Sequence, residues 1–248
     1  LCYNRPQMVA QTQRGFTIIE VMLFLAISGL LFAMLMIGAN NGITQQRYLD
    51  SVRSYKAFLQ NQYSEVLNTR NSRNTQWKCD ASGAAVDTSG VVSTPGTDTN
   101  CIILGRVIKI SSSGDSFTVA NVTGHIAATA SPSDDLQTYS PTEVPETETW
   151  EMDWGSQLKV DDANPLSPNG AVILILRSPV SGLMRIYTDP NPASAVNHDM
   201  SNMVNASHTA KLCHYINGSS GSLPGQWITI NPKIASADGV STSEGGCS

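Results

Sequence analysis

The stretch from Gln13 to Ala39 reads QRGFTIIEVMLFLAISGLLFAMLMIGA, and it decides how the rest of the chain is organised. Every residue from Val21 to Ala39 is apolar or small, so these nineteen positions predict a helix roughly 28 Å long. That length matches a bilayer core of about 30 Å, which makes a membrane-spanning helix the expected structure. Glu20 is the single charge at the edge of this run, where an unpaired carboxylate is costly and tends to be functional.

The residues around Gly15 resemble the processing and assembly signal of type IV pilins and type II secretion pseudopilins. The resemblance is carried by Arg14-Gly15-Phe16-Thr17-Ile18-Ile19-Glu20 and by the apolar helix that follows. In that family a membrane peptidase cuts after the glycine, and the new amino terminus, usually phenylalanine, is N-methylated. The resemblance implies a cut between Gly15 and Phe16. It also implies that Glu20 is the carboxylate that helps dock each subunit into a growing filament.

Residues 1–15 are expected to be a prepilin leader. They are polar, carry Arg5 and Arg14, and would stay cytoplasmic by the positive-inside tendency. Met8 would give a leader of eight residues, a normal length in the resembled family, and Leu1 is the alternative start. An ordinary secretory signal is the competing interpretation, but it predicts a shorter apolar core and a small-x-small cleavage site. The length of the run and the opening Glu20 favour the prepilin leader.

The helix is expected to continue beyond the apolar run. No proline occurs between Phe16 and Pro95, and from Ile43 onward apolar residues recur three or four positions apart. This spacing, with polar residues between, is typical of an amphipathic helix. We therefore predict a transmembrane or filament-core helix over 16–42 and an amphipathic stalk helix over 43–78. The predicted apolar stripe contains Leu49, Val52, Tyr55, Leu59, Tyr63, Val66 and Leu67.

The charge distribution bears on possible partners. Removing the leader leaves thirteen basic residues against twenty acidic ones, a net charge of −7, whereas a general nucleic-acid binder is more often basic. Six of the thirteen basic residues lie in the stalk: Arg47, Arg53, Lys56, Arg70, Arg73 and Lys78. They fit a solvated helix face better than a contact with DNA or acidic lipid, because the stalk tyrosines fall on the apolar stripe. The sequence thus gives no firm nucleic-acid signal.

The cysteines predict an oxidised head. Cys2 would leave with the leader, so an even number remains, which in an exported domain indicates two disulfides with three possible pairings. We expect Cys79–Cys101 and Cys213–Cys247, because each pair brackets one loop-rich segment. The second pair also resembles the C-terminal disulfide loop of many pilins. Free buried thiols are the alternative, and a zinc site is disfavoured because no two cysteines have close ligand spacing.

Residues 79–248 are expected to form an extracytoplasmic, β-rich globular head. A polar, glycine-rich loop is predicted over 80–100, and 134–162 is acidic, with nine carboxylates against Lys159 alone. The acidic segment predicts either a solvated loop or a partner-facing loop in which Trp150 and Trp154 anchor a basic neighbour. β-like runs occur at 101–110, 116–122, 157–160, 171–177, 183–188, 212–216 and 226–231. The fold class is therefore α+β, with one long helix laid against an antiparallel sheet.

Candidate catalytic and metal-binding groups are sparse. Cys213 and His214 are adjacent, but neighbours on a strand point to opposite faces, and a disulfide would remove the thiol nucleophile. No Asp-x-Asp-x-Asp-Gly calcium loop, Gly-x-Ser-x-Gly elbow or Gly-x-Gly-x-x-Gly turn occurs. The Thr-Leu-x-Thr-Cys strand motif of sortases is absent as well. We therefore expect no catalytic residue, no metal and no cofactor.

Together these features predict a non-enzymatic minor pilin or pseudopilin. The pattern of the end of the stalk and of the first strand after it resembles H-type minor pseudopilins. The resemblance implies that its partners are other pilin or pseudopilin subunits, the prepilin peptidase and the inner-membrane assembly platform. It further implies a single-pass membrane protein that later enters an extracellular or cell-surface filament. The alternative is a membrane-anchored extracytoplasmic binding module or enzyme that never polymerises and has no need of Glu20.

Overall fold

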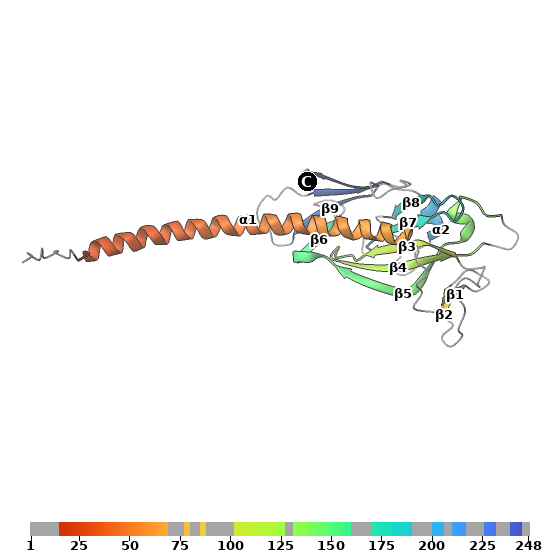
Figure 1. Ribbon diagram of the computed structural model, residues 1–248, viewed down its shortest axis with the longest axis horizontal. Helices are drawn as coiled ribbons and strands as arrows, with labels where there is room; N and C mark the ends of the chain where they lie inside the picture. The colour runs from red at the N-terminus through yellow and green to blue at the C-terminus, as the bar shows by residue number, and fades with distance from the viewer. Residues whose placement is uncertain are drawn as a thin grey trace, which may run out of the picture. The chain divides into compact units, whose positions relative to one another are not determined.

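The computed structural model describes residues 15–68, 77–79, 85–87, 102–126, 131–159, 170–189, 200–205, 210–216, 226–231 and 239–244 (Figure 1). The chain divides into two compact units, Leu1–Gln45 and Gln46–Ser248. The first unit contains the beginning of the long helix α1. The second contains the rest of α1 together with the strands. The two units are described separately below.

Helix α1 runs without interruption from Ile18 to Leu67. At its start the Glu20 backbone N–H donates to the Thr17 hydroxyl at 3.3 Å, as expected of an N-cap threonine. At its end Arg177 Nη1 donates to the Leu67 carbonyl at 3.2 Å, which satisfies one of the carbonyls that a helix end leaves free. The predicted stalk over 43–78 is therefore too long, because α1 ends at Leu67 and Trp77–Cys79 form strand β1.

A five-stranded antiparallel sheet forms the larger part of the second unit. Its order is β5 (Thr142–Glu151), β4 (Ser116–Gly124), β3 (Ile102–Ile110), β7 (Ala171–Arg177) and β8 (Met184–Asp189). The apolar run of β7 is explained by burial on both faces of the sheet: Ile173 and Ile175 enter one core, while Val172 and Leu174 enter the other. The prediction of a strand at 171–177 is confirmed.

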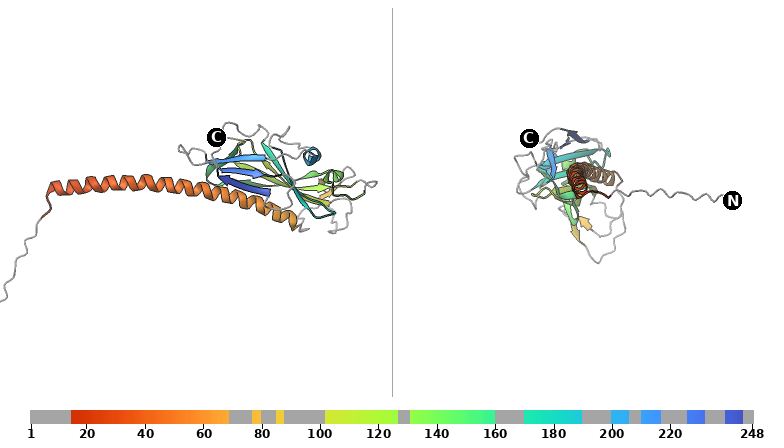
Figure 2. Two further views of the ribbon diagram at one scale, coloured as in Figure 1. Left: turned by 90° about the horizontal axis from the view of Figure 1, so that it is seen from above. Right: turned by 90° about the vertical axis from the view of Figure 1, so that its left-hand side faces the viewer.

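A four-stranded antiparallel sheet completes the first of these cores. Its order is β11 (Val240–Glu244), β10 (Gln226–Ile230), β9 (Ala210–Ile216) and β6 (Ser156–Lys159). Leu158, Leu212 and Ile228 of this sheet share a core with the buried stripe of α1, which lies against the strands in Figure 2. The far face of the larger sheet is covered by helix α2 (Met200–Asn205) and the turn η1 (Leu136–Tyr139). A separate hairpin pairs β1 with β2 (Ala85–Asp87). The α+β class is confirmed.

The acidic segment 134–162 is the main correction to the predicted fold. It contains η1, the whole of β5, the turn η2 (Asp153–Gly155) and β6, so the interpretation as a loop is wrong. Pro145 lies where the pairing of β5 with β4 shifts register, between the partners of Ala120 and Val122. A proline is tolerated at such an irregularity on an edge strand because no ladder hydrogen bond is lost. The predicted loop 80–100 contains β2, and the rest of it lies outside the described residues.

Candidate functional site

The predicted processing site precedes the first turn of α1. Gly15 and Phe16 are both exposed, and the Phe16 side chain is 81% accessible. A Cβ added to Gly15 would meet no atom within 4 Å. Within the first unit, the residues on either side of the expected cut are therefore exposed to an approaching enzyme.

Glu20 lies in the first turn of α1, with its side chain exposed. The spacing Thr17-x-x-Glu20 is that of a capping box, and the threonine half of it is formed. A carboxylate in the first turn also faces the partly positive end of the helix dipole. Glu20 thus helps α1 to begin at this point.

The N-terminal part of α1 presents an apolar surface on all sides. Among the described residues, α1 is the one helix long and apolar enough to cross a membrane, judged by length and composition, and none of its most apolar window is buried. A water-facing helix normally buries one stripe and exposes a polar one. The exposed large side chains of this surface are Ile18, Ile19, Val21, Met22, Leu23, Phe24, Leu25, Ile27, Leu30, Leu31, Phe32, Met34, Leu35, Met36 and Ile37.

The later part of α1 has the predicted amphipathic pattern. Five of the predicted stripe residues are buried, Leu49 is half-buried and Leu67 is exposed. Two of the stalk cations have local partners: the Arg47 guanidinium lies 4.9 Å from the Trp154 ring centroid, and Arg53 lies 3.7 Å from Asp50. Arg70 and Arg73 lie outside the described residues. The five buried stripe residues are Val52, Tyr55, Leu59, Tyr63 and Val66.

The two tryptophans of the acidic segment have different surroundings. Trp150 is half-buried against Phe58 of α1, at 4.4 Å between ring centroids. Trp154 is 56% exposed and adopts φ 62°, a left-handed conformation that bulky residues rarely take. Ser54 donates to the Asp153 carboxylate at 2.8 Å and ties this turn to α1. The fold therefore displays Trp154 at the surface, as a partner-facing segment requires.

Cys213 is buried and disulfide-bonded, so it offers no free thiol. The pairing with Cys247 stays a prediction, as does that of Cys79 with Cys101, because the other three cysteine side chains lie outside the described residues.

His214 belongs to a buried polar network that the sequence did not reveal. Its Nε2 lies 3.1 Å from the Ser51 hydroxyl, which in turn lies 2.5 Å from the Ser156 hydroxyl. Burial lowers the pKa of His214 to about 4, so the ring is neutral at pH 7. All three side chains are at most 1% exposed, so no substrate reaches this serine and histidine. The signal that could have found Ser51 is its place on the buried stripe of α1, beside Val52.

Metal chemistry finds no support in the part of the chain that the structure describes. No group of three or more His, Cys, Asp or Glu side chains is placed there to hold a metal ion. Several of the described carboxylates instead accept hydrogen bonds from serines, and others pair with a lysine or an arginine. Asp115 accepts from Ser113 and Ser111, and Asp134 accepts from Ser178; these bonds lower the pKa of both carboxyls.

Comparison with known proteins identifies the N-terminal signal. Residues 11–36 match the family model of the prokaryotic N-terminal methylation motif. No curated protein and no solved structure matches the chain. The matched stretch contains Gly15, Phe16 and Glu20, and it supports a protein of the type IV pilin and pseudopilin type. Proteins of this type are structural, and the motif together with the apolar helix fits a membrane-anchored protein.

Proposed function

We propose that this chain is a non-enzymatic subunit, a minor pilin or pseudopilin, of a type IV pilus or a type II secretion-like filament. The observation that carries the proposal is an apolar helix surface, left exposed by the fold, that directly follows the glycine of a methylation motif. Such a surface is stable in a bilayer before assembly and in the core of a helical filament after it. The folded second unit would be the extracytoplasmic head.

Processing would begin at the exposed bond between Gly15 and Phe16. A prepilin peptidase would cut this bond, and the new amino group of Phe16 would then be methylated. Methylation of an amine leaves its positive charge in place. The mature chain would therefore carry a cation at its first residue, one helical turn before Glu20.

Assembly would move the apolar segment from lipid to the core of the filament through the inner-membrane platform. A lone carboxylate in an apolar core is costly, whereas one paired with a cation is tolerated. Glu20 would pair with the amino group of Phe16, on the same or the neighbouring subunit. This pairing would set the register in which each new subunit packs.

The elaborate head favours a minor role over that of an abundant shaft subunit. Its described residues include a five-stranded sheet, a four-stranded sheet, the β1–β2 hairpin and two hydrophobic cores, one of them shared with α1. A subunit used in few copies can carry such a head without every neighbour having to accommodate it.

Replacement of the glycine at the cleavage site tests this function. Gly15→Leu is expected to accumulate as uncut precursor and to be missing from filaments, because a leucine side chain keeps the peptidase from approaching the backbone. Gly29→Ala is the matched control, since an added Cβ at Gly29 also meets no atom within 4 Å. Immunoblots of membranes and sheared filaments from the native host give both readouts. Normal trimming of the Gly15→Leu chain would refute the proposal.

A further inference from the structure

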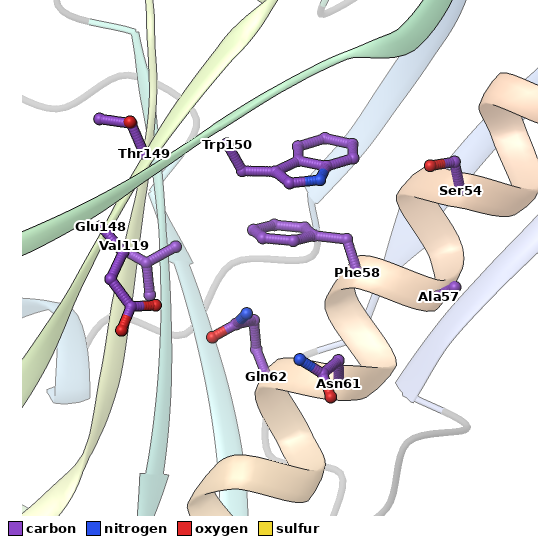
Figure 3. Close-up of a pocket in the computed structure, with 9 residues that line it drawn as sticks. All are labelled: Ser54, Ala57, Phe58, Asn61, Gln62, Val119, Glu148, Thr149 and Trp150. Atoms are coloured by element: carbon purple, nitrogen blue, oxygen red, sulfur yellow. The ribbon is translucent and has the colours of Figure 1, made fainter.

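A groove opens in the second unit between α1 and the edge strand β5 (Figure 3). It encloses about 340 Å³. One side consists of helix residues and the other of strand residues, all of them described. The lining residues are Ser54, Ala57, Phe58, Asn61, Gln62, Val119, Glu148, Thr149 and Trp150. We refer to it as the β5 groove.

The inner part of the β5 groove is aromatic and held in place by the core. Figure 3 shows the Phe58 and Trp150 rings stacked on each other. Their centroids lie 4.4 Å apart and their planes differ by 13°. Behind them Phe117 lies 5.1 Å from Trp150, and it is fully buried. An aromatic wall fixed in this way can pack against the aliphatic part of a ligand without first losing conformational freedom.

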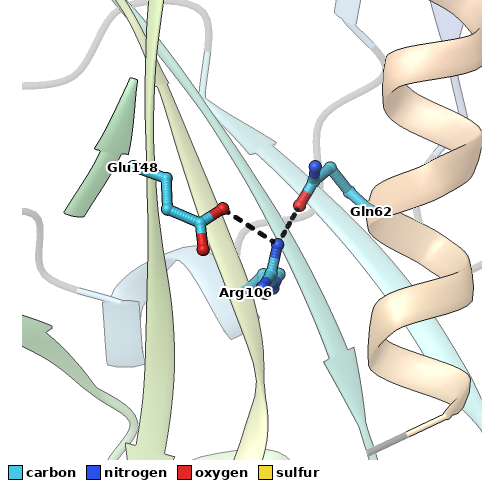
Figure 4. Close-up of polar contacts among 3 residues, drawn as sticks. All are labelled: Gln62, Arg106 and Glu148. Carbon is cyan, nitrogen blue, oxygen red and sulfur yellow. Dashed lines mark hydrogen bonds and ion pairs between the residues drawn. The ribbon is translucent and has the colours of Figure 1, made fainter. Parts of the chain in front are cut away.

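Three polar side chains, those of Gln62, Arg106 and Glu148, connect the helix side of the groove to the strand side (Figure 4). Arg106 Nη1 donates to Gln62 Oε1 at 2.7 Å and lies 3.7 Å from Glu148 Oε2. The Arg106 side chain is 16% exposed and that of Glu148 is 72% exposed. Arg106 therefore positions the carboxylate of Glu148 at the groove mouth, while most of that carboxylate stays open to a ligand.

The outer edge of β5 is able to accept another strand. β5 ends the order of the five-stranded sheet and pairs only with β4 among the described strands, although β2 also contacts it. Natural edges are blunted by proline and bulges, and here both occur at Pro145. Beyond that irregularity the register with β4 is regular from Thr147 to Glu151. The residues 147–149 are exposed.

The charges around the β5 groove favour a cationic occupant. Glu148 lies at its mouth, Glu151 is exposed at the end of the same strand, and Asp153 is exposed in the turn η2 that follows. Glu65 is exposed on α1, one turn beyond Asn61 and so on the same helix flank. Arg106 also contacts the groove, but its guanidinium is already engaged by Gln62 and Glu148.

We propose that the β5 groove binds an extended segment of a partner protein that carries lysine or arginine. The segment would add to β5 as a further strand, so that its backbone pairs with residues 147–151. On the groove side, the aliphatic stem of its cation would lie against the Phe58 and Trp150 wall. The cationic head would reach Glu148, which supplies charge selectivity and the register of the added strand.

Peptide titration against the full-length chain in detergent micelles tests this inference. The probe is the octapeptide Thr-Lys-Val-Lys-Thr-Lys-Val-Thr, with two comparison peptides: one has glutamate in place of lysine, and one has proline in place of both valines. Calorimetry is expected to detect the lysine peptide, with at least about tenfold weaker binding of each comparison peptide. Glu148→Lys should weaken the lysine peptide about tenfold and strengthen the glutamate peptide.

Three results would overturn the inference. In the first, wild type and Glu148→Lys bind the lysine peptide with equal affinity. In the second, wild type binds the proline peptide as tightly as the lysine peptide. In the third, no peptide binds at all. Chitohexaose binding without peptide binding would assign the groove to a glycan and would overturn it as well. Trp150→Ala is a second variant, expected to weaken the lysine peptide while keeping the circular dichroism of the fold. The assay needs no filament, so its failure is distinguishable from failure of the proposed function.

Discussion

The two parts of α1 differ in what covers their apolar side chains. Leu31, in the first unit, is 55% exposed, whereas Leu59, in the second unit, is 1% exposed. Both are leucines within the same unbroken helix. Burial of a leucine stabilises by roughly 1.5–3 kcal/mol, so the later part of α1 contributes to folding of the head. The apolar side chains of the earlier part are exposed and do not stabilise the head. We propose that a bilayer or other subunits cover them.

The largest difference between the two parts of α1 is expected when one acidic residue is removed from each. Glu20→Ala is expected to be processed and folded but to enter filaments at least roughly tenfold less, because the Phe16 amine then stays unpaired in an apolar core. Asp50→Ala, which removes an exposed acid from the later part, is the matched control. The measurement is the ratio of filament to membrane pools by immunoblot. Normal incorporation of Glu20→Ala would count against the assembly role.

A leucine pair sharpens the comparison in terms of stability. Leu59→Ala should lower the free energy of unfolding of the head by about 2–5 kcal/mol, because it leaves a cavity between α1 and the sheets. Leu31→Ala should leave that free energy unchanged, since its side chain touches no core. Urea unfolding of both variants in the same detergent, followed by tryptophan fluorescence, provides the comparison. Equal losses in the two variants would mean that the two parts of α1 do not differ in this way.

A smaller effect is expected from acid. Burial lowers the pKa of His214 to about 4, whereas an unfolded histidine titrates near 6.5. The unfolded state therefore takes up a proton first, and stability should fall by up to about 3 kcal/mol as the pH drops from 6.5 to 4. Full stability from this group is present above pH 6.5. His214→Asn removes the titration, so the difference in urea midpoint between it and wild type should narrow in acid. A constant difference would show that His214 does not titrate in this range.

The parts of the fold that depend on neighbouring residues could be predicted. The apolar run by itself predicts a helix long enough to span a membrane, and the spacing of Tyr55, Leu59 and Tyr63 predicts the buried stripe of α1. Strand β7 could be predicted for the same reason, because its apolar run is visible in the sequence itself. The predicted stalk was too long because polar residues past Leu67 do not break helical periodicity in the sequence. Within the described residues, the contact with Arg177 and the pairing of β1 with β2 mark that end.

The parts that depend on distant pairing could not be predicted. Strand β5 consists largely of threonine and glutamate, and its conformation comes from pairing with β4 and from Trp150 packing on Phe58. The contact of Ser51 with His214 joins residues 163 positions apart. The disulfide pairings stay predictions because only the Cys213 side chain lies within the described residues. The roles of Gly15, Phe16 and Glu20 stay predictions because a cut and a neighbouring subunit lie outside a single chain.

The measurement that tests the central claim most directly is intact mass, with N-terminal peptide sequencing, on protein from native membranes. The account predicts a chain that begins at Phe16 and carries one methyl group on its amino terminus. A chain that keeps the residues before Phe16 would contradict processing and turn attention to an anchored binding module. A chain that begins near residue 40 would contradict the filament assignment outright, because an ordinary secretory signal would then have been removed together with the whole apolar segment.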